Sequence, residues 1–426
     1  MTAPIATSQT ILVVGGGISG MTAALEAAEC GRDVVLVERS PTLGGRTALL
    51  YRYFPKMCHP TCGLEINLRR LKGNRNVRVM TMVEVVRIEG KRGAYTATLK
   101  IRPRYVNENC TVCGDCAAAV GAEIPNPHNY GQDKIKAAYL PFAMAYPQRY
   151  VLDPSLIGTE DADKAKAACK VGAIDLAMQE ETVELAVGAV VWATGWKPYD
   201  AAKIQPYGYG RFPNVVTSVE FERMADPAGP TGGKLLRPSD GQEAKNIAFI
   251  QCAGSRDENH LRHCSRICCM ATLKQTQYVR ESQGDAAKST VYYIDIRAID
   301  RFEDFYQMVQ KDASVTFVKS KVASIDQARN QDLVLNGVDT EGYHRYASTH
   351  DLVVLAIGME PESNGLTLPD DLITDSSGFI EGTLDGGMVG AGAAASPLDV
   401  NRSVQSATGA ALRAIKVIHQ TVGEEA

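Results

Sequence analysis

The chain has 426 residues, of which 45% are hydrophobic and 22% charged, the composition of a globular protein with room for two or three domains. Its 45 Lys and Arg stand against 49 Asp and Glu, so no basic excess exists to neutralise phosphates, and nucleic acid is excluded as the main partner. No apolar run approaches the ~20 residues that cross a bilayer, and the first ten residues lack the pattern of a signal peptide. We therefore expect a cytoplasmic protein that neither spans nor crosses a membrane by itself.

The first 38 residues predict a strand–helix–strand unit with a dinucleotide site. Strands are expected at residues 10–15 and 33–38, with an alanine-rich helix at 18–30 between them. The turn Gly15-Gly16-Gly17-Ile18-Ser19-Gly20 satisfies G-x-G-x-x-G. Its first two motif glycines allow a tight turn and the approach of a pyrophosphate, and the third lets the helix pack on the strand. Glu38, which ends the second strand, is placed to bind a ribose hydroxyl.

Three later segments favour FAD over NAD. Leu43-Gly44-Gly45-Arg46 follows soon after, the buried runs 184–194 and 352–358 end in glycine, and Gly390-Ala391-Gly392 precedes a C-terminal helix at 400–420. This order resembles the glutathione and thioredoxin reductase superfamily, which has two dinucleotide folds. Most of its members carry an Asp after the last glycine, where Ala393 stands here. The expected flavin-site residues are Gly15, Gly17, Ile18, Ser19, Gly20, Glu38, Arg39, Gly44, Gly45, Arg46, Ala193, Thr194, Gly195, Gly358, Gly392 and Ala393.

Residues 105–179 differ in texture and predict an inserted iron–sulfur domain. Cys110, Cys113 and Cys116 form C-x2-C-x2-C, the start of a bacterial ferredoxin run. Val120 occupies the fourth position of that run, whose cysteine binds the other cluster in two-cluster ferredoxins. Cys169 is then the expected fourth ligand of one [4Fe–4S] cluster. Zinc held by the same four thiolates is the alternative.

A second strand–helix–strand pattern lies at residues 246–251, about 265–282 and 289–294. Its turn has one glycine, Gly254, followed by cysteines where the helix begins. Because a helix N-terminus favours anions, we expect a second [4Fe–4S] cluster in place of a nicotinamide nucleotide, with structural zinc or merely buried cysteines as alternatives. The expected ligands are Cys252, Cys264, Cys268 and Cys269.

The predicted fold is therefore α/β, with two dinucleotide-binding-type domains as in glutathione and thioredoxin reductases and a ferredoxin-like insertion. The FAD-binding domain is expected to be discontinuous, and the second Rossmann-like domain is expected to carry a cysteine-held cluster. The predicted boundaries are 1–104, 180–240 and 345–426 for the FAD-binding domain, 105–179 for the insertion and 241–344 for the second domain.

Residues 251–269, QCAGSRDENHLRHCSRICC, resemble the signature of heterodisulfide reductase A-type flavoproteins. Residues 52–66, RYFPKMCHPTCGLEI, and 105–120, YVNENCTVCGDCAAAV, resemble one branch of that family, the A-type flavoproteins of quinone-interacting membrane-bound oxidoreductases of sulfate reducers and some sulfur oxidisers. The resemblance covers nearly the whole chain. It implies an electron-transfer subunit with FAD and iron–sulfur clusters that acts between membrane quinone and adenylylsulfate reductase.

The same resemblance implies a position on the inner face of the cytoplasmic membrane, reached through sister subunits. These would be a second heterodisulfide reductase A-like flavoprotein and a membrane haem and iron–sulfur subunit. Within the family, the alternative is a heterodisulfide reductase-type subunit, with or without electron bifurcation.

Two further functions stay open. A pyridine-nucleotide disulfide reductase would use Cys58 and Cys62 as a redox pair, but their C-x3-C spacing is one residue shorter than the C-x4-C of that family. The cysteine-filled second unit also argues against NAD(P)H binding. The pair could instead hold a cluster or pack structurally. A scaffold with a vestigial flavin site is opposed by the intact Gly15, Gly17, Gly20 and Glu38.

Overall fold

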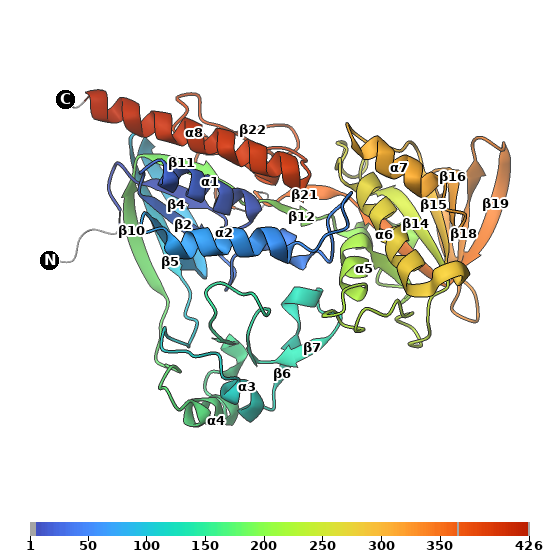
Figure 1. Cartoon of the computed structure of the whole chain (residues 1–426), viewed down its shortest axis with the longest axis horizontal. Coiled ribbons are helices and arrows are strands. Elements are labelled where there is room, and N and C mark those ends of the chain that lie inside the picture. Colours follow the sequence, from blue (N-terminus) through green and yellow to red (C-terminus); the bar gives the residue numbers. More distant parts are fainter. Residues whose placement is uncertain (1–5, 364–365, 425–426) are drawn as a thin grey trace. The chain divides into compact units, whose positions relative to one another are not determined.

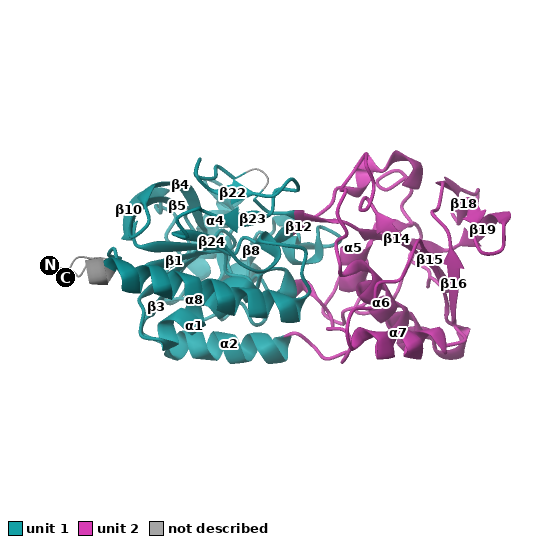
Figure 2. Cartoon of the chain, turned by 90° about the horizontal axis from the view of Figure 1, so that it is seen from above, with its two compact units in different colours: residues 1–48, 61–196, 361–426 teal, residues 49–60, 197–360 magenta. Residues whose placement is uncertain are grey.

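In the computed structural model, residues 6–363 and 366–424 are described, and the chain divides into two compact units (Figure 2). The first unit comprises residues 1–48, 61–196 and 361–426, and the second comprises 49–60 and 197–360. Residues 197–240 and 345–360 thus belong to the second unit, whereas the sequence boundaries assign them to the FAD-binding domain. The reason is strand pairing: the strand at Val215–Thr217 pairs with the strand at Leu352–Ile357 inside the second sheet.

The first unit is built on a seven-stranded sheet of order β22-β23-β24-β11-β1-β2-β3, in which the strands from β24 to β3 run parallel (Figure 1). The sheet strands are β1 (Ile11–Val14), β2 (Val34–Glu38), β3 (Val77–Thr81), β11 (Ala189–Trp192), β22 (Ile373–Thr374), β23 (Ile380–Gly382) and β24 (Met388–Gly390). The helices of this core are α1 (Ile18–Glu29), α2 (Thr61–Gly73) and α8 (Val400–Glu424).

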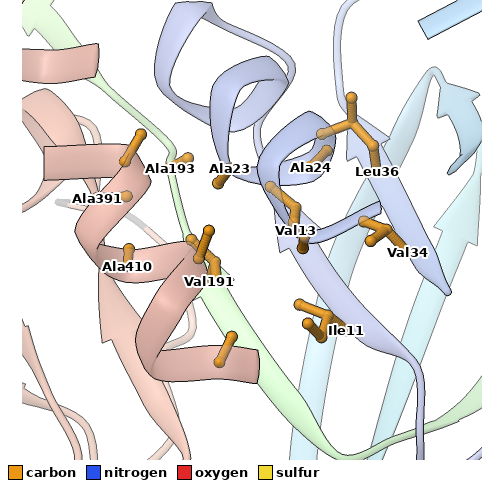
Figure 3. Packing of buried hydrophobic residues seen from close by; sticks show 14 of the residues in the cluster. Ile11, Val13, Ala23, Ala24, Val34, Leu36, Val191, Ala193, Ala391 and Ala410 are labelled. Carbon is orange, nitrogen blue, oxygen red and sulfur yellow. The ribbon is translucent and has the colours of Figure 1, made fainter. Parts of the chain in front are cut away.

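Alternating side chains of the central strands supply two cores. Ile11 and Val13 of β1 pack with residues of α1, α2 and α8 on one face of the sheet (Figure 3). Leu12 and Val14 point to the opposite face, which is covered by an antiparallel sheet of order β10-β5-β4. Its strands are β4 (Val83–Lys91), β5 (Ala94–Ile101) and β10 (Glu181–Val187). The central strands are therefore buried on both sides, as their unbroken aliphatic runs predict.

Two runs that the sequence predicts as single strands are each divided between two sheets. The run 184–194 is split at Gly188 into β10 and β11, because a Cβ at Gly188 would lie 2.0 Å from the Ser8 carbonyl oxygen and the chain changes sheet there. The run 77–87 is split at Met82, which adopts a left-handed φ of 62° between β3 and β4. Both predictions of a continuous strand are wrong, since a close backbone approach leaves no signature in hydrophobic periodicity.

The insertion lies within the first unit and has a small core of its own. Val106, Val120, Leu152 and Leu156 are buried in it with Cys116. Its elements are α3 (Asp115–Ala119), β6 (Glu123–Pro125), β7 (Lys134–Lys136), β8 (Ala138–Tyr139), β9 (Val151–Leu152) and α4 (Glu160–Ala168). Among the described residues, no helix of the chain is long and apolar enough to cross a membrane.

The second unit repeats the layered plan with a five-stranded parallel sheet of order β13-β20-β14-β15-β16. Helices cover one face and a three-stranded antiparallel sheet, β17-β18-β19, contributes to the core on the other. The sheet strands are β13 (Val215–Thr217), β14 (Asn246–Ala253), β15 (Lys288–Tyr293), β16 (Val315–Lys319) and β20 (Leu352–Ile357). The remaining elements are α5 (Ser218–Met224), α6 (Cys268–Gln283), α7 (Phe302–Gln310), β17 (Ser324–Gln327), β18 (Leu333–Asp339) and β19 (His344–His350), with short strands β12 (Trp196–Pro198) and β21 (Met359–Pro361) at the unit boundaries.

A buried polar network fastens the segment 49–60 to the second unit. The Glu222 carboxylate of α5 accepts hydrogen bonds from the main-chain N–H groups of Tyr51 (3.0 Å) and Arg52 (3.3 Å). It also accepts from Lys274 Nζ (2.6 Å) and the Tyr278 hydroxyl (2.8 Å) of α6, and Lys274 donates to the Arg52 carbonyl oxygen (2.8 Å). Because Glu222 and Lys274 are both nearly inaccessible, these partners are needed to offset the cost of burying two charges.

Candidate functional site

The glycine turn between β1 and α1 combines forced packing with an open position. A Cβ at Gly15 would lie 2.3 Å from the Ala193 carbonyl oxygen, and one at Gly20 would lie 1.7 Å from the Gly15 carbonyl oxygen. A Cβ at Gly17 would meet nothing closer than the Gly45 Cα at 3.9 Å. The outer glycines are therefore required by the strand and helix, while Gly17 leaves space beside the first turn of α1. That is the position at which a pyrophosphate approaches the backbone in a dinucleotide fold.

Glu38 lies next to this turn, at the carboxyl end of β2. Its Oε2 accepts the Gly16 N–H at 2.6 Å, and its Oε1 accepts the Ser40 N–H at 2.8 Å. Two charge-assisted hydrogen bonds therefore fix the carboxylate in one orientation. Arg39, the next residue, is mostly exposed and pairs with Glu362 at 2.8 Å. The predicted ribose contact thus has a rigid acceptor in the expected place, whereas Arg39 has a protein partner.

The segment that follows β2 packs directly on the glycine turn. Gly44 adopts φ of 116° and donates its N–H to the Gly16 carbonyl oxygen at 2.9 Å, and a Cβ at Gly45 would lie 2.9 Å from Gly17 Cα. Arg46 bonds the Trp196 carbonyl oxygen, lies 5.1 Å from the centre of the Trp196 ring and is 3.7 Å from a Glu362 oxygen. Its predicted phosphate contact therefore has to compete with these neighbours.

Residues from the ends of β11 and β24 reach the same region. Ala193 donates its N–H to the Val14 carbonyl oxygen at 2.8 Å, and its place beside β1 is visible in Figure 3. The Thr194 hydroxyl is buried without a hydrogen-bond partner among the described residues. A Cβ at Gly392 would lie 1.9 Å from Ser19 Oγ at the start of α1. Ile18, Gly195 and Ala393 also belong to this unit.

These residues fit FAD on two observations. The open position at Gly17 provides the close backbone approach that a pyrophosphate needs, and the unpaired Thr194 hydroxyl is a buried polar group that calls for a partner. Gly358 is the one predicted flavin-site residue that is not brought here. It ends β20 in the second unit, where its N–H bonds the Ala253 carbonyl oxygen at 3.0 Å. An aliphatic strand ending in glycine occurs in both sheets, so the pattern alone could not assign Gly358 to one of them.

The four cysteines predicted for the insertion line a single pocket, together with residues that include Tyr150 and Val171. The pocket wall is otherwise largely apolar. Burial raises the pKa of the Cys116 thiol to about 11, with the nearby Cys110 and Cys113 adding to the effect. The Cys169 sulfur accepts the Ala173 N–H at 3.2 Å. Several thiols facing one enclosed space, with a main-chain donor aimed at one of them, fit a [4Fe–4S] cluster.

The second set of cysteines surrounds the start of α6. Cys268 and Cys269 are its first two residues, and Cys252 lies at the irregular end of β14 with a left-handed φ of 56°. Burial and the other three thiols raise the pKa of Cys268 well above its ordinary value, and burial raises that of Cys269 to about 11, with Cys252 and Cys264 adding to it. The mutual effects indicate that the four thiols are neighbours.

Two features of this second turn oppose a nucleotide and fit a cluster. A Cβ at Gly254 would lie 2.3 Å from the Tyr199 ring, so the one glycine of the turn is closed by packing. Gln251, directly before Cys252, is 5% exposed, and neither of its side-chain polar atoms has a partner in the described part of the chain. Among the described residues, no three His, Cys, Asp or Glu side chains converge as a site for one bare metal ion.

Sequence reasoning missed two residues at this second site. The Arg256 guanidinium lies 3.9 Å from the Cys252 sulfur and forms an ion pair with Asp295, which also lies near Cys269 through its carbonyl oxygen at 3.8 Å. Arg256 stands within the quoted cysteine motif, but nothing in the sequence links it to a residue 39 positions later. Cys58 and Cys62 are both exposed and belong to different units.

Comparison with known proteins adds a family model and a set of relatives. The FAD dependent oxidoreductase model matches residues 10–61. Methanopyrus kandleri has two A-type iron–sulfur subunits of CoB–CoM heterodisulfide reductase, and both are 36% identical to this chain. The match to the first covers all of this chain and 68% of the relative, and the match to the second covers 95% and 63%. The A-type subunit of the ferredoxin/F420H2-dependent CoB–CoM heterodisulfide reductase of Methanosarcina acetivorans is 38% identical, over 83% of this chain and 45% of the relative.

Solved structures share the fold at low sequence identity. Thioredoxin reductase of T. acidophilum gives a TM-score of 0.53 at 13% identity, with 96% of this chain and 98% of that chain covered. Thioredoxin reductase of Lactococcus lactis gives 0.51 at 14% identity, covering 98% of this chain and 99% of the other. The α/β fold predicted from the sequence, with two dinucleotide-binding-type units, is thereby confirmed.

Proposed function

The chain belongs to the heterodisulfide reductase A-type family of FAD-dependent oxidoreductases, and from this membership we propose that it is an electron-transfer subunit that holds FAD and two [4Fe–4S] clusters. The observation that carries the proposal is the second turn. Cysteines surround the start of α6, and the ring of Tyr199 closes the position at Gly254 that a nucleotide phosphate would need.

The relatives' names favour a heterodisulfide reductase-type subunit over the other function suggested by the sequence. Because the chain spans 63% of one of the Methanopyrus relatives, the activity and the partners of the complete relatives are proposals for it. The second candidate is a subunit that acts between membrane quinone and adenylylsulfate reductase, at the inner face of the cytoplasmic membrane. It rests on the residues at 52–66 and 105–120 that resemble that branch of the family.

The side chains of this protein would have distinct tasks. The turn at Gly17 and the N–H groups of α1 would bind the pyrophosphate, and Glu38 would orient the ribose. The two sets of thiolates would hold the clusters, and burial would keep water from them. When bound, FAD exchanges electrons in pairs or singly, and [4Fe–4S] clusters exchange single electrons. The protein therefore contributes positions and potentials for its cofactors.

A reduction experiment tests the absence of a nicotinamide site. The anaerobically purified chain is mixed with stoichiometric NADH or NADPH, and the flavin absorbance is followed. We expect it to persist with either nucleotide and to bleach when reduced methyl viologen, a one-electron donor, is added. Rapid bleaching by NADH would contradict the proposal and restore the disulfide reductase alternative.

Iron analysis tests the ligands of the insertion. Cys169→Ala should lose about half of the roughly eight iron atoms that two clusters contain and keep its flavin, whereas Cys58→Ala should keep all of its iron. Zinc in the wild-type protein in place of iron, or full iron in the Cys169 variant, would show that the assignment is wrong. Identifying the subunits that co-purify with the native protein would separate the two candidate complexes.

A further inference from the structure

Arg256 is held in an unusual conformation beside one of the proposed cluster ligands. Its backbone adopts a left-handed φ of 55°, which non-glycine residues rarely adopt. Its guanidinium NH1 is 3.9 Å from the Cys252 sulfur, and its side chain is 22% exposed. Cys252 and Arg266, in the same loop, are also left-handed, with φ of 56° and 64°. Such conformations persist where surrounding structure holds them, and they cluster at functional sites.

Asp295 fixes the direction of this guanidinium. The Asp295 carboxylate pairs with Arg256 NH1 and is 3.5 Å from Arg297 Nε. Asp295 lies two residues beyond β15, the strand that corresponds in this unit to β2 of the first. In the first unit Glu38, at the end of β2, is aimed at the glycine turn. The acidic residue of the second unit therefore holds a cation against a thiol instead of facing a ribose.

The other three thiols of this set contact main-chain groups. Cys264 accepts the Arg266 N–H at 3.4 Å, Cys268 lies 3.5 Å from the Ile357 carbonyl oxygen, and Cys269 lies 3.8 Å from that of Asp295. Arg256 thus brings a full positive charge to one corner of an otherwise neutral surround. A charge in a partly buried position acts more strongly than it would in water.

We propose that Arg256 is a positioning residue that raises the reduction potential of the iron–sulfur centre held by the second set of cysteines. The inference rests on the proposed function. One-electron reduction of such a centre adds one negative charge, breaks no bond and moves no proton. The Arg256 guanidinium, aimed at the Cys252 sulfur, favours the more negative state, so its charge shifts the potential in the positive direction. Net charge and hydrogen bonds to the sulfurs are established determinants of such potentials.

The test is an anaerobic redox titration of the whole chain, followed by the EPR signal of the reduced second centre. That signal is identified as the one absent from a Cys268→Ser/Cys269→Ser variant. Arg256→Gln should move its midpoint to a more negative potential, and Arg256→Lys, which keeps the charge, should restore most of the shift. Arg262→Gln is the matched control, because Arg262 is exposed in the same loop, and it should leave the midpoint unchanged.

Two results would overturn the inference. One is a wild-type midpoint in Arg256→Gln with its full iron content. The other is an equal shift in Arg256→Gln and Arg256→Lys, which would show that the charge is not the cause. If Arg256→Gln loses iron, the Lys variant still decides the question. Failure of the proposed function looks different, because the wild-type chain would then show no second iron–sulfur signal at all.

Discussion

The two units begin with the same local plan and use it in opposite ways. In the first, three glycines join β1 to α1, and the position at Gly17 is open beside the helix N-terminus. In the second, residues 254–267 join β14 to α6, Tyr199 closes the position at Gly254, and cysteines begin the helix. A helix N-terminus stabilises an anion without specifying which one. The residues of the turn therefore decide whether that anion is a phosphate or an iron–sulfur cluster.

Removing the cysteines of the second helix start should have the largest effect. Cys268→Ser/Cys269→Ser should lose about half of the roughly eight iron atoms of two clusters, because two of the four ligands of one cluster are gone. The flavin absorbance should remain, since the glycine turn belongs to the other unit. Iron and flavin content of the purified protein measure both. Cys30→Ser, at an exposed cysteine of the first unit, should change neither, and full iron in the double variant would contradict the comparison.

Glycine variants test the division of labour inside the first turn. Gly17→Ala should lose FAD on desalting while the flavin-free protein keeps its thermal stability, because the added methyl group enters open space at an ordinary φ of −73°. Gly20→Ala should lower stability itself, by roughly 1–3 kcal/mol or more, since its Cβ would lie 1.7 Å from the Gly15 carbonyl oxygen. Equal unfolding temperatures for the two flavin-free variants would show that the open position is no special feature of Gly17.

Glu38→Ala should weaken FAD retention by roughly 1.5–3 kcal/mol, the usual worth of a hydrogen bond to a charged group. Its carboxylate is already oriented by Gly16 and Ser40, so little ordering is needed when the ribose arrives. Glu29→Ala serves as the control, because Glu29 ends α1 on the surface and pairs with Arg70. Flavin titration of the flavin-free proteins gives the two affinities. A Glu38 variant that binds FAD as tightly as the wild type does would remove this residue from the site.

The smallest effect concerns a buried histidine in the second unit. Burial lowers the pKa of His350 to about 4, and its ring contacts Tyr292, Ser348 and Asn246, each at 3.0 Å. In the unfolded chain the group binds its proton near pH 6.5, so the unfolded state binds more protons between pH 6.5 and 4. Stability should therefore fall as the pH is lowered through this range, by at most about 1.4 kcal/mol per pH unit.

Chemical unfolding at pH 6.5 and 4.5 measures this slope. His350→Gln should flatten it in the transition that reports on the second unit. An unchanged slope in the variant would assign the acid sensitivity to other groups.

The sequence predicts the parts of this molecule that local chemistry determines. The glycine turn, the acidic end of β2 and the clustering of the cysteines can all be recognised along the chain, and the aliphatic runs indicate buried parallel strands. The division of 184–194 at Gly188 and of 77–87 at Met82 depends on backbone contacts with distant segments. The placement of Gly358 fails for a related reason, since β11 and β20 have the same character and differ only in their neighbours. Arg256 and Asp295 meet only after folding.

The segment 49–60 bears on how this protein can be dissected. Residues 197–360 look like a contiguous module that could be expressed alone, but the second unit also needs Tyr51 and Arg52, whose main-chain groups satisfy Glu222 and Lys274. A fragment without them would leave two buried charged groups short of partners, a costly state in a protein interior. We expect such a fragment to be insoluble or poorly folded. A viable excised module would have to carry residues 49–60 as a fused strap.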